Sequence, residues 1–509
     1  MTAFTKQKMK LRLPDSAQNW ISLVGATIAL ITLFLILFLF VISLLLGQGG
    51  LYLGLVTYIL LPAVLIFGLL LIPIGMLIRT VQMRGKEKVK SGWPVINLGD
   101  PKHRNAFFIF LIGTVFFLFL SAIGNYEAFH YTETVQFCGT LCHQIMQPEY
   151  TAYQHSPHAK LLCVSCHVGP GASWYVRSKL SGLHQVYATL TNSYPKPIET
   201  PIKNLRPARV VCEQCHWPQK FYSRTLRLET HYLPDKNNTR WDIRLIMKIG
   251  PQHKAHGLRT GIHWHINPNV KIEYLAVDKK RTDIPWVRYI NLKTGDTLIF
   301  KNSEEPIPPQ KIDASAIRTM DCIDCHTRPS HDYQAPSYFL NTAMANGRVS
   351  PDLPDIKSVA LSIFDADFTT KDSMLQAIQT KLTRYYSKKC PTIFESKKSQ
   401  LDTAIQTIQE LSSRNIFPYM KVRWDTHVNN IGHLEFKGCF RCHDNSHISR
   451  DGQVISRKCD LCHLINSQGS PGKMETAPAF QSLEFRHPVD IDKAWKNMAC
   501  SECHTGLNP

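Results

Sequence analysis

One short pattern repeats along the last three-quarters of the chain and constrains its fold more than any other feature. Six times the sequence reads Cys-x-x-Cys-His, and a seventh copy, at residues 138–143, has one extra residue between its cysteines. We number these copies motif 1 (138–143), motif 2 (163–167), motif 3 (212–216), motif 4 (322–326), motif 5 (439–443), motif 6 (459–463) and motif 7 (500–504). Cys-x-x-Cys-His is the attachment sequence of c-type haem, in which both thiols bond the porphyrin and the His ligates the iron.

The motifs therefore predict seven covalently bound haem c groups. The expected attachment cysteines are Cys138, Cys142, Cys163, Cys166, Cys212, Cys215, Cys322, Cys325, Cys439, Cys442, Cys459, Cys462, Cys500 and Cys503. The expected proximal iron ligands are His143, His167, His216, His326, His443, His463 and His504. Zinc ribbons also pair cysteines, but they do not need a His after every pair. Redox-active Cys-x-x-Cys normally occurs singly, and disulfide frameworks do not repeat this tripeptide.

Three uncharged runs precede motif 1, at residues 20–46, 51–78 and 105–126, and each is long enough to cross a bilayer as a helix. Lys and Arg dominate residues 1–19 and 79–104, so the positive-inside rule places both segments in the cytoplasm. Three crossings then place all seven motifs outside, where bacteria attach c-type haem. The sequence thus predicts a bacterial inner-membrane protein with a periplasmic haem region.

The net charge of +19 is expected to face anionic lipid and the haem propionates, and we predict no nucleic-acid partner. Eleven residues, 127–137, separate the third run from motif 1. A continued helix of that length would span roughly 17 Å. The first haem is therefore expected near the outer leaflet, where it can exchange electrons with a quinol dissolved in the membrane.

The long segments between the motifs predict two inserts. Residues 270–277, 286–290 and 298–300 alternate as strands do, which indicates a small antiparallel sheet. Residues 371–389 and 394–415 carry apolar residues at helical spacing, which indicates a helical hairpin. The expected fold is a multihaem cytochrome c with three N-terminal transmembrane helices and a mostly α, haem-packed periplasmic region with a small β insert. The expected domains are a membrane domain (1–126), a three-haem domain (127–220), a β-containing insert (221–321) and a four-haem domain with the hairpin (322–509).

Residues 100–220 resemble the NapC/NirT/NrfH family of membrane-anchored quinol dehydrogenases. The likeness rests on a haem motif followed by a Met, on Tyr153-Gln-His-Ser-Pro-His158, on Val168-Gly-Pro after motif 2, and on Lys179. The segments 261–265, 320–329 and 430–443 are similar to larger inner-membrane cytochromes of the seven-haem ImcH type. The resemblance implies that Lys179 serves the quinol and that His158 is a distal iron ligand. It also implies that Met146 ligates the first iron, for which His143 remains the alternative.

Distal ligands for the remaining irons must come from histidines outside the motifs. The candidates are His231, His263, His265, His331, His447 and His487, with His427 and His433 as further alternatives. His331 and His447 closely follow a motif, and His263 and His265 would point the same way in an extended segment. So many histidines favour iron with two imidazole ligands, which has no open position for a substrate and therefore transfers electrons.

The function expected from these observations is oxidation of menaquinol and delivery of its electrons to periplasmic c-type cytochromes in anaerobic or extracellular respiration. The chain is then an electron-transfer protein with quinol dehydrogenase activity. Two alternatives remain open at this point. One is a haem-bearing anchor subunit of a larger respiratory complex, and the other is a multihaem terminal reductase.

Overall fold

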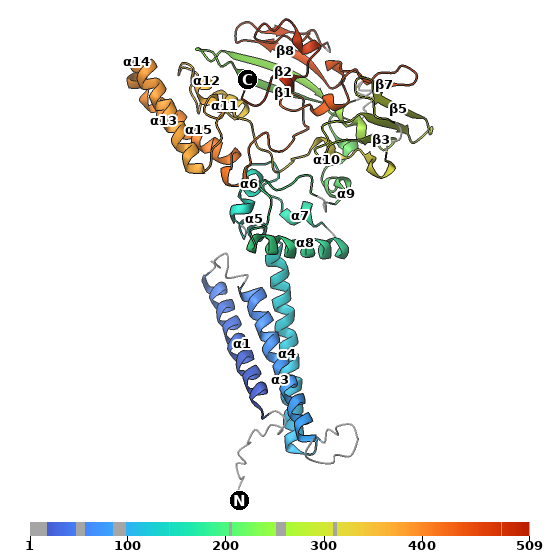
Figure 1. The fold of residues 1–509 in the computed structure, drawn as a ribbon, viewed down its shortest axis with the longest axis vertical. Coiled ribbons are helices and arrows are strands. Elements are labelled where there is room, and N and C mark those ends of the chain that lie inside the picture. Colours follow the sequence, from blue (N-terminus) through green and yellow to red (C-terminus); the bar gives the residue numbers. More distant parts are fainter. Residues whose placement is uncertain are drawn as a thin grey trace, which may run out of the picture. The chain divides into compact units, whose positions relative to one another are not determined.

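The computed structural model describes residues 18–46, 56–84, 98–141, 143–169, 171–202, 206–250, 261–308, 313–479 and 481–507. The chain forms two compact units, residues 1–143 and 144–509. The first unit is helical, and the second combines short helices, a helical hairpin and two β-sheets (Figure 1).

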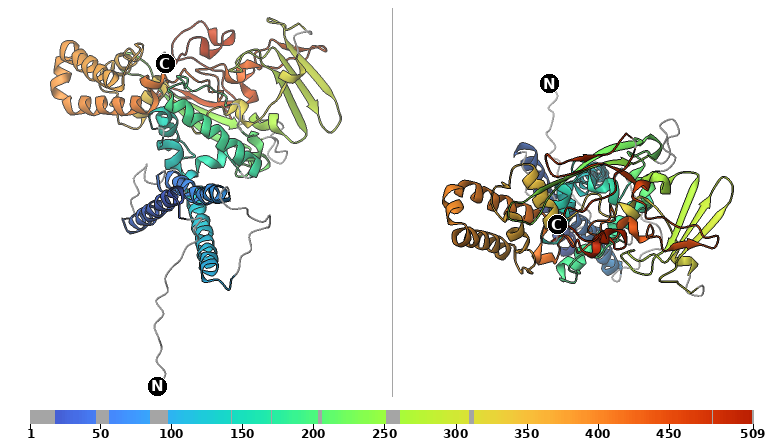
Figure 2. Two further views of the ribbon diagram at one scale, coloured as in Figure 1. Left: turned by 60° about the horizontal axis from the view of Figure 1, so that its bottom comes forward. Right: turned by 90° about the horizontal axis from the view of Figure 1, so that it is seen from above.

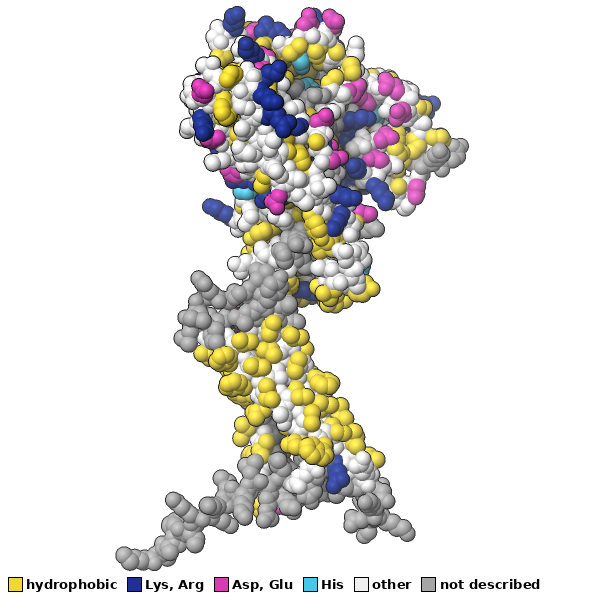
Figure 3. All heavy atoms as spheres, turned by 60° about the vertical axis from the view of Figure 1, so that its left-hand side comes forward, with side chains coloured by type: hydrophobic (Ala, Val, Ile, Leu, Met, Phe, Trp, Pro, Cys, Tyr) yellow, Lys and Arg dark blue, Asp and Glu magenta, His cyan; other side chains and the backbone are white. Residues whose placement is uncertain are grey.

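Three long helices of the first unit are apolar enough to cross a membrane: α1 (Trp20–Leu46), α3 (Leu61–Arg84) and α4 (Pro101–Thr132). A short π-helical turn (Val56–Leu60) precedes α3. The three expected spans are thus confirmed, although the first residues expected in the second span, 51–55, lie outside the described residues. Hydrophobic side chains cover the visible face of these helices (Figure 3), as lipid contact requires.

Helices α1 and α3 pack closely because glycines lie where they meet. A Cβ atom on Gly25 would lie 2.7 Å from the carbonyl oxygen of Gly68, and one on Gly68 would lie 2.9 Å from the backbone nitrogen of Ala29. Ser22 adds a hydrogen bond from its hydroxyl to the carbonyl oxygen of Ile72 (2.9 Å). Small residues at such contacts are typical of membrane helices, where packing rather than the hydrophobic effect drives association.

The segment between α4 and motif 1 is not one continuous helix. Helix α4 ends at Thr132, and a new short helix, α5 (Val135–Thr140), carries Cys138. The side chain of Thr134 caps α5 by accepting a hydrogen bond from the backbone N–H of Phe137 (3.1 Å). A capped helix start satisfies donors that would otherwise have no partner.

Each later motif lies on a single tight helical turn of the second unit. Motif 2 coincides with α7 (Cys163–His167), α9 (Ala208–Cys212) leads into motif 3, and motif 4 begins with α10 (Cys322–Cys325). Motifs 5, 6 and 7 lie on the 3₁₀ turns Gly438–Arg441, Cys459–Leu461 and Cys500–Glu502. On one turn, residues three positions apart are neighbours, so the two thiols of a motif face the same side. Two longer helices, α6 (His143–Gln154) and α8 (Ala172–Leu190), flank motif 2 in the sequence.

The β-structure is larger than the sequence predicts. The expected antiparallel sheet is present as β3 (Val270–Leu275), β4 (Trp286–Asn291) and β5 (Thr297–Asn302). A second sheet contains β1 (Arg224–Tyr232) and β2 (Arg240–Lys248), which the sequence analysis missed. The first sheet also contains β6 (Arg318–Thr319), at the end of the insert, and β7 (His447–Ser449), which lies outside it. The second sheet also contains β8 (His463–Gly469) and β9 (Glu475–Thr476), which both lie outside the insert. Their strand orders are β6-β3-β4-β5-β7 and β1-β2-β8-β9, with antiparallel pairs throughout.

The predicted helical hairpin is confirmed as α13 (Lys371–Lys389) and α15 (Lys398–Asn415), joined by α14 (Pro391–Ser396). Together with α11 (Pro336–Ala345) and α12 (Ile356–Leu361), these helices enclose the largest apolar core of the second unit. Within that unit they lie on the opposite side from β3, β4 and β5 (Figures 1 and 2).

Candidate haem-binding sites

Six of the seven motif histidines lie opposite a second histidine from elsewhere in the chain. The pairs, with the distance between ring centroids, are His167 with His331 (6.1 Å), His216 with His158 (6.0 Å), His326 with His263 (6.2 Å), His443 with His265 (5.8 Å), His463 with His433 (6.2 Å) and His504 with His487 (6.1 Å). The distance is nearly constant although the angle between the ring planes ranges from 4° to 87°. Direct ring stacking therefore does not explain the spacing.

The spacing fits one iron atom between two imidazoles. A metal–imidazole bond is about 2 Å, and a ring centroid lies about 1.1 Å behind the bonded nitrogen, so two axial rings are about 6 Å apart. Among the described residues, no group of three or more His, Cys, Asp or Glu side chains is arranged to hold a metal ion by itself. The arrangement thus suits a porphyrin, which supplies four ligands of its own, better than a zinc ribbon.

Five of the six partner histidines have a backbone carbonyl oxygen within hydrogen-bond distance of their Nδ1 atom. Nδ1 of His331 lies 3.0 Å from the carbonyl oxygen of Glu149, that of His263 lies 2.8 Å from Ile249, and that of His487 lies 2.8 Å from Val489. The same kind of contact joins His265 to Ile262 (2.8 Å) and His158 to Pro329 (3.3 Å). Because a carbonyl oxygen only accepts, Nδ1 carries the proton and Nε2 keeps the lone pair that a metal needs.

A short segment after motif 4 orients two of these ligands. Arg328 donates from Nε to the carbonyl oxygen of His331 (2.7 Å) and from Nη2 to both carboxylate oxygens of Glu149 (3.1 and 3.0 Å). The Ser330 hydroxyl lies 3.1 Å from Nδ1 of His158. Burial alone would raise the pKa of Glu149, but Arg328 and His331 beside it hold that pKa below its usual value. Glu149 therefore stays ionised and keeps Arg328 in place, a role that the sequence analysis missed.

His263 and His265 are not on an extended segment. They lie on the 3₁₀ turn Ile262–Ile266, so their rings diverge and reach two different motif histidines, His326 and His443. Burial lowers the pKa of His265 to about 4, so this imidazole is neutral at pH 7, as a metal ligand must be.

His447 does not have the geometry expected of an axial ligand. Its Nδ1 lies 2.9 Å from a carboxylate oxygen of Asp444, and its Nε2 lies 2.6 Å from the carbonyl oxygen of Ile284. Burial would lower the pKa of His447, but these two acceptors raise it above its usual value. Because each ring nitrogen already faces an oxygen acceptor, neither is directed at an iron, and this geometry argues against the expected role.

His231, another expected ligand, lies on β1 beside Asn341, whose Nδ2 is 3.4 Å from Nδ1 of the ring. The ring found opposite motif 7 is that of His487 instead. Opposite motif 6 lies His433, which the sequence analysis named only as a further alternative. Burial lowers the pKa of His433 to about 4 and keeps this ring neutral. Position in the sequence could not separate His433 from His447, because both lie within ten residues of motif 5.

The first haem motif is described only in part. Cys142 and the side chain of His143 lie outside the described residues, and Met146 is half-buried on α6. Lys179 lies on α8, with its Nζ atom 4.9 Å from the centroid of the Tyr175 ring. His427 is a buried histidine with Nδ1 3.0 Å from the Thr200 hydroxyl.

Comparison with known proteins places these features in context. Residues 100–201 match the family model described as the NapC/NirT cytochrome c family, N-terminal region. Over 489 residues the chain is 42% identical to the cytochrome c-type protein ImcH of Geobacter sulfurreducens, and the alignment covers 96% of this chain and 95% of that protein. No solved structure matches the chain.

Proposed function

The chain belongs to the NapC/NirT cytochromes c as an ImcH-like member, and on that premise we propose that it oxidises menaquinol and passes the electrons to periplasmic c-type cytochromes. It is a membrane-anchored cytochrome c with covalently bound haem, and it acts in electron transfer. The proposal extends this to seven haems, to a quinol as the electron donor and to the inner membrane of a bacterium, with the second unit in the periplasm.

The six histidine pairs are the observation that carries the proposal. We assign His331, His158, His263, His265, His433 and His487 as the distal ligands of motifs 2 to 7 in that order. Haem iron with two imidazole ligands cycles between the ferrous and ferric states and carries one electron at a time. A set of such sites without an open iron position supports electron transfer over reduction of a substrate. For motif 1, Met146 and His143 remain the candidate iron ligands.

Lys179 is the candidate quinol residue. Helix α8, which carries Lys179, also has an exposed apolar stripe formed by Val176, Leu180, Leu183, Tyr187 and Leu190. An apolar surface beside a lysine ammonium group suits a molecule with a hydrophobic ring and tail and a polar hydroxyl. We propose that the Nζ atom of Lys179 binds a quinol hydroxyl. Oxidation of one quinol to quinone releases two protons, on the outer side of the membrane in this proposal, and two electrons to the haems.

A reduction assay with purified full-length protein in liposomes tests the function. A reduced menaquinol analogue is added, and the haem absorbance is compared with the full reduction given by dithionite. We expect the analogue to reduce the haems without any other protein present. Haems that stay oxidised, although dithionite reduces all of them, would contradict the proposal.

Two variants test the residue assignments. Lys179→Ala should slow reduction by the quinol analogue at least tenfold, while Arg177→Ala on the same helix serves as the matched control. For the distal ligands, His433→Ala should convert one haem to the high-spin state in the electron paramagnetic resonance spectrum. His447→Ala should leave every haem low-spin, because both of its ring nitrogens are already hydrogen-bonded. The opposite result for this pair of variants would reverse the assignment.

A further inference from the structure

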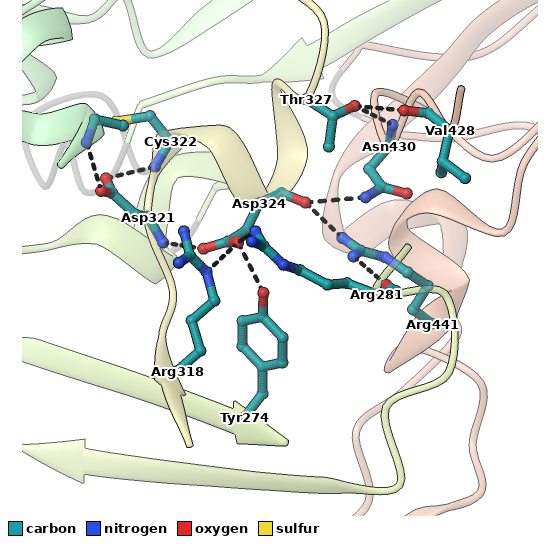
Figure 4. Close-up of polar contacts among 11 residues, drawn as sticks. Tyr274, Arg281, Arg318, Asp321, Cys322, Asp324, Thr327, Val428, Asn430 and Arg441 are labelled. Atoms are coloured by element: carbon teal, nitrogen blue, oxygen red, sulfur yellow. Dashed lines mark hydrogen bonds and ion pairs between the residues drawn. The ribbon is translucent and has the colours of Figure 1, made fainter. Parts of the chain in front are cut away.

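Asp324 is a buried carboxylate inside motif 4, between Cys322 and Cys325, and its side chain has no exposed surface. One of its carboxylate oxygens, Oδ1, accepts hydrogen bonds from the Tyr274 hydroxyl (2.7 Å), from Nε of Arg318 (2.7 Å) and from Nη1 of Arg281 (2.9 Å) (Figure 4). A buried charge is stable only when it is paired in this way.

The other carboxylate oxygen fixes the start of the motif. Oδ2 of Asp324 accepts from the backbone N–H of Asp321 (2.6 Å), which completes a capping box at the start of α10. The carboxylate of Asp321 accepts from the backbone N–H of Cys322 (2.6 Å) and from that of Ala208 (3.0 Å). Because Ala208 begins α9, which leads into motif 3, the same cap also ties motif 4 to its predecessor.

Arg441, inside motif 5, contacts the backbone of motif 4. Its Nη2 atom donates to the carbonyl oxygen of Asp324 (2.8 Å), its Nη1 to that of Arg281 (2.8 Å), and its Nε to that of Gly438 (2.8 Å). Asn430 donates a further hydrogen bond to the Asp324 carbonyl (3.2 Å), as Figure 4 shows. The guanidinium group of Arg441 in motif 5 is thus hydrogen-bonded to the backbone of motif 4.

The two motifs are joined a second time through their opposite histidines. His263 and His265 come from one 3₁₀ turn, and their rings lie opposite His326 of motif 4 and His443 of motif 5. A displacement of either motif would therefore break contacts both at its cysteine turn and at its histidine partner.

We infer that Asp324 and Arg441 hold motifs 4 and 5 as one rigid pair, and that the carboxylate of Asp324 lowers the reduction potential of the haem on motif 4. The inference rests on the haem binding in the proposed function. A negative charge stabilises ferric over ferrous iron, and burial preserves that effect because little water screens it. Arg281 and Arg318 offset part of the negative charge of Asp324, so the net charge at this site depends on the Asp324 carboxylate. Both Asp324 and Arg441 are positioning residues, since neither is expected to bind iron.

Asp324→Asn in the full-length haem-loaded protein tests the charge. The midpoint potentials are followed by absorbance and electron paramagnetic resonance, and the haem content is measured separately. We expect one potential to rise while the haem content stays unchanged. Glu273→Gln is the matched control, because Glu273 is a buried carboxylate on the same strand as Tyr274, points to the opposite face and pairs with Lys271 and Arg288. Equal potentials in Asp324→Asn and the unmodified protein, or the same shift in both variants, would overturn the inference.

Two further variants keep the inference testable if Asp324→Asn loses haem. Tyr274→Phe removes one hydrogen bond but leaves the carboxylate, so its charge is less compensated and the same potential should fall. Arg441→Lys keeps the positive charge but loses the hydrogen bonds to the carbonyl oxygens of Asp324, Arg281 and Gly438. The electron paramagnetic resonance signals of the haems on motifs 4 and 5 should therefore change. A potential that rises in Tyr274→Phe, or signals that stay unaltered in Arg441→Lys, would contradict the inference. The quinol assay distinguishes the two proposals, because its failure would leave these potential shifts unaffected.

Discussion

The haem motifs and the helical core of the second unit are held together in different ways. In the helical core, defined here as α11 to α15, the side chains of Leu340, Ile356, Ile378, Leu382 and Ile408 are fully buried against one another. The turns that carry motifs 2, 6 and 7 contain no buried residue. They are held by backbone hydrogen bonds, and His331, which lies opposite motif 2, is positioned by Glu149 and Arg328. The helical core is thus built by the hydrophobic effect, whereas the motif turns depend on polar contacts and on the haem that they bind.

The largest expected effect comes from withholding haem. We expect the full-length chain made without haem attachment to keep its helical core and to lose structure around the motifs. In hydrogen exchange, amides of α13 and α15 should then be protected by several kcal/mol, and those of motifs 2, 6 and 7 by about 0 kcal/mol. Equal protection in the two regions would remove the contrast between them.

Truncating the helical core should cost stability without affecting the haem. Leu382 is fully buried on α13, and Leu382→Ala should lower the free energy of unfolding by about 2–5 kcal/mol. The haem absorbance and the midpoint potentials should not change. Denaturant unfolding followed by circular dichroism measures the loss, with Thr380→Ala at an exposed position of the same helix as the control. A change in any potential would show that the two regions are coupled.

Lys357 places a buried amine in the helical core. Its ammonium group is fully buried and contacts the carbonyl oxygen of Tyr232 and Oδ1 of Asn341. Burial lowers the pKa of Lys357 from 10.5 to about 7. Between these two values the unfolded chain binds more protons, so the free energy of unfolding should fall as the pH drops from about 10 to about 7.

Lys357→Met removes this titration. We expect the stability at pH 7 to rise by on the order of 1–3 kcal/mol, since the cost of burying the amine exceeds the two lost hydrogen bonds. The dependence of stability on pH between 7 and 10 should also become flatter. Thermal unfolding across this range measures both. If the variant is less stable at pH 7 and keeps the slope, the buried amine is not the source of the pH dependence.

The smallest expected effect lies on the surface of the helical core. Glu410 on α15 pairs with Arg348 and Arg414, and all three side chains are substantially exposed. Glu410→Gln should therefore lower the free energy of unfolding by no more than about 1 kcal/mol, and by less at high salt. Denaturant unfolding at two salt concentrations checks this. A loss as large as that from Leu382→Ala would mean that polar contacts stabilise the helical core as they do the motif turns.

Several features could be predicted from the sequence because they depend on neighbouring residues. The uncharged runs predict the membrane-spanning helices, and helical spacing predicts both bounds of α13 and the end of α15, which begins four residues after the predicted start. Strands β1 and β2 were missed; they share a sheet with β8. Strand β8 begins at His463 of motif 6, opposite Met247. The pairing of β2 with β8 joins strands so distant in the chain that no local pattern identifies it, whereas β1 and β2 form a local hairpin that the sequence analysis overlooked.

The sequence by itself predicts where haem attaches, because two thiols and the adjacent His must lie within one turn of chain. Only the tertiary structure decided which histidine lies opposite each motif. His265 and His443 are far apart in the sequence. His433 and His447 both lie within ten residues of motif 5, yet His433 is opposite motif 6 while His447 is hydrogen-bonded at both nitrogens. Attachment is a local covalent requirement, whereas an axial pair forms only where folding brings two imidazoles about 6 Å apart with their Nε2 atoms facing each other.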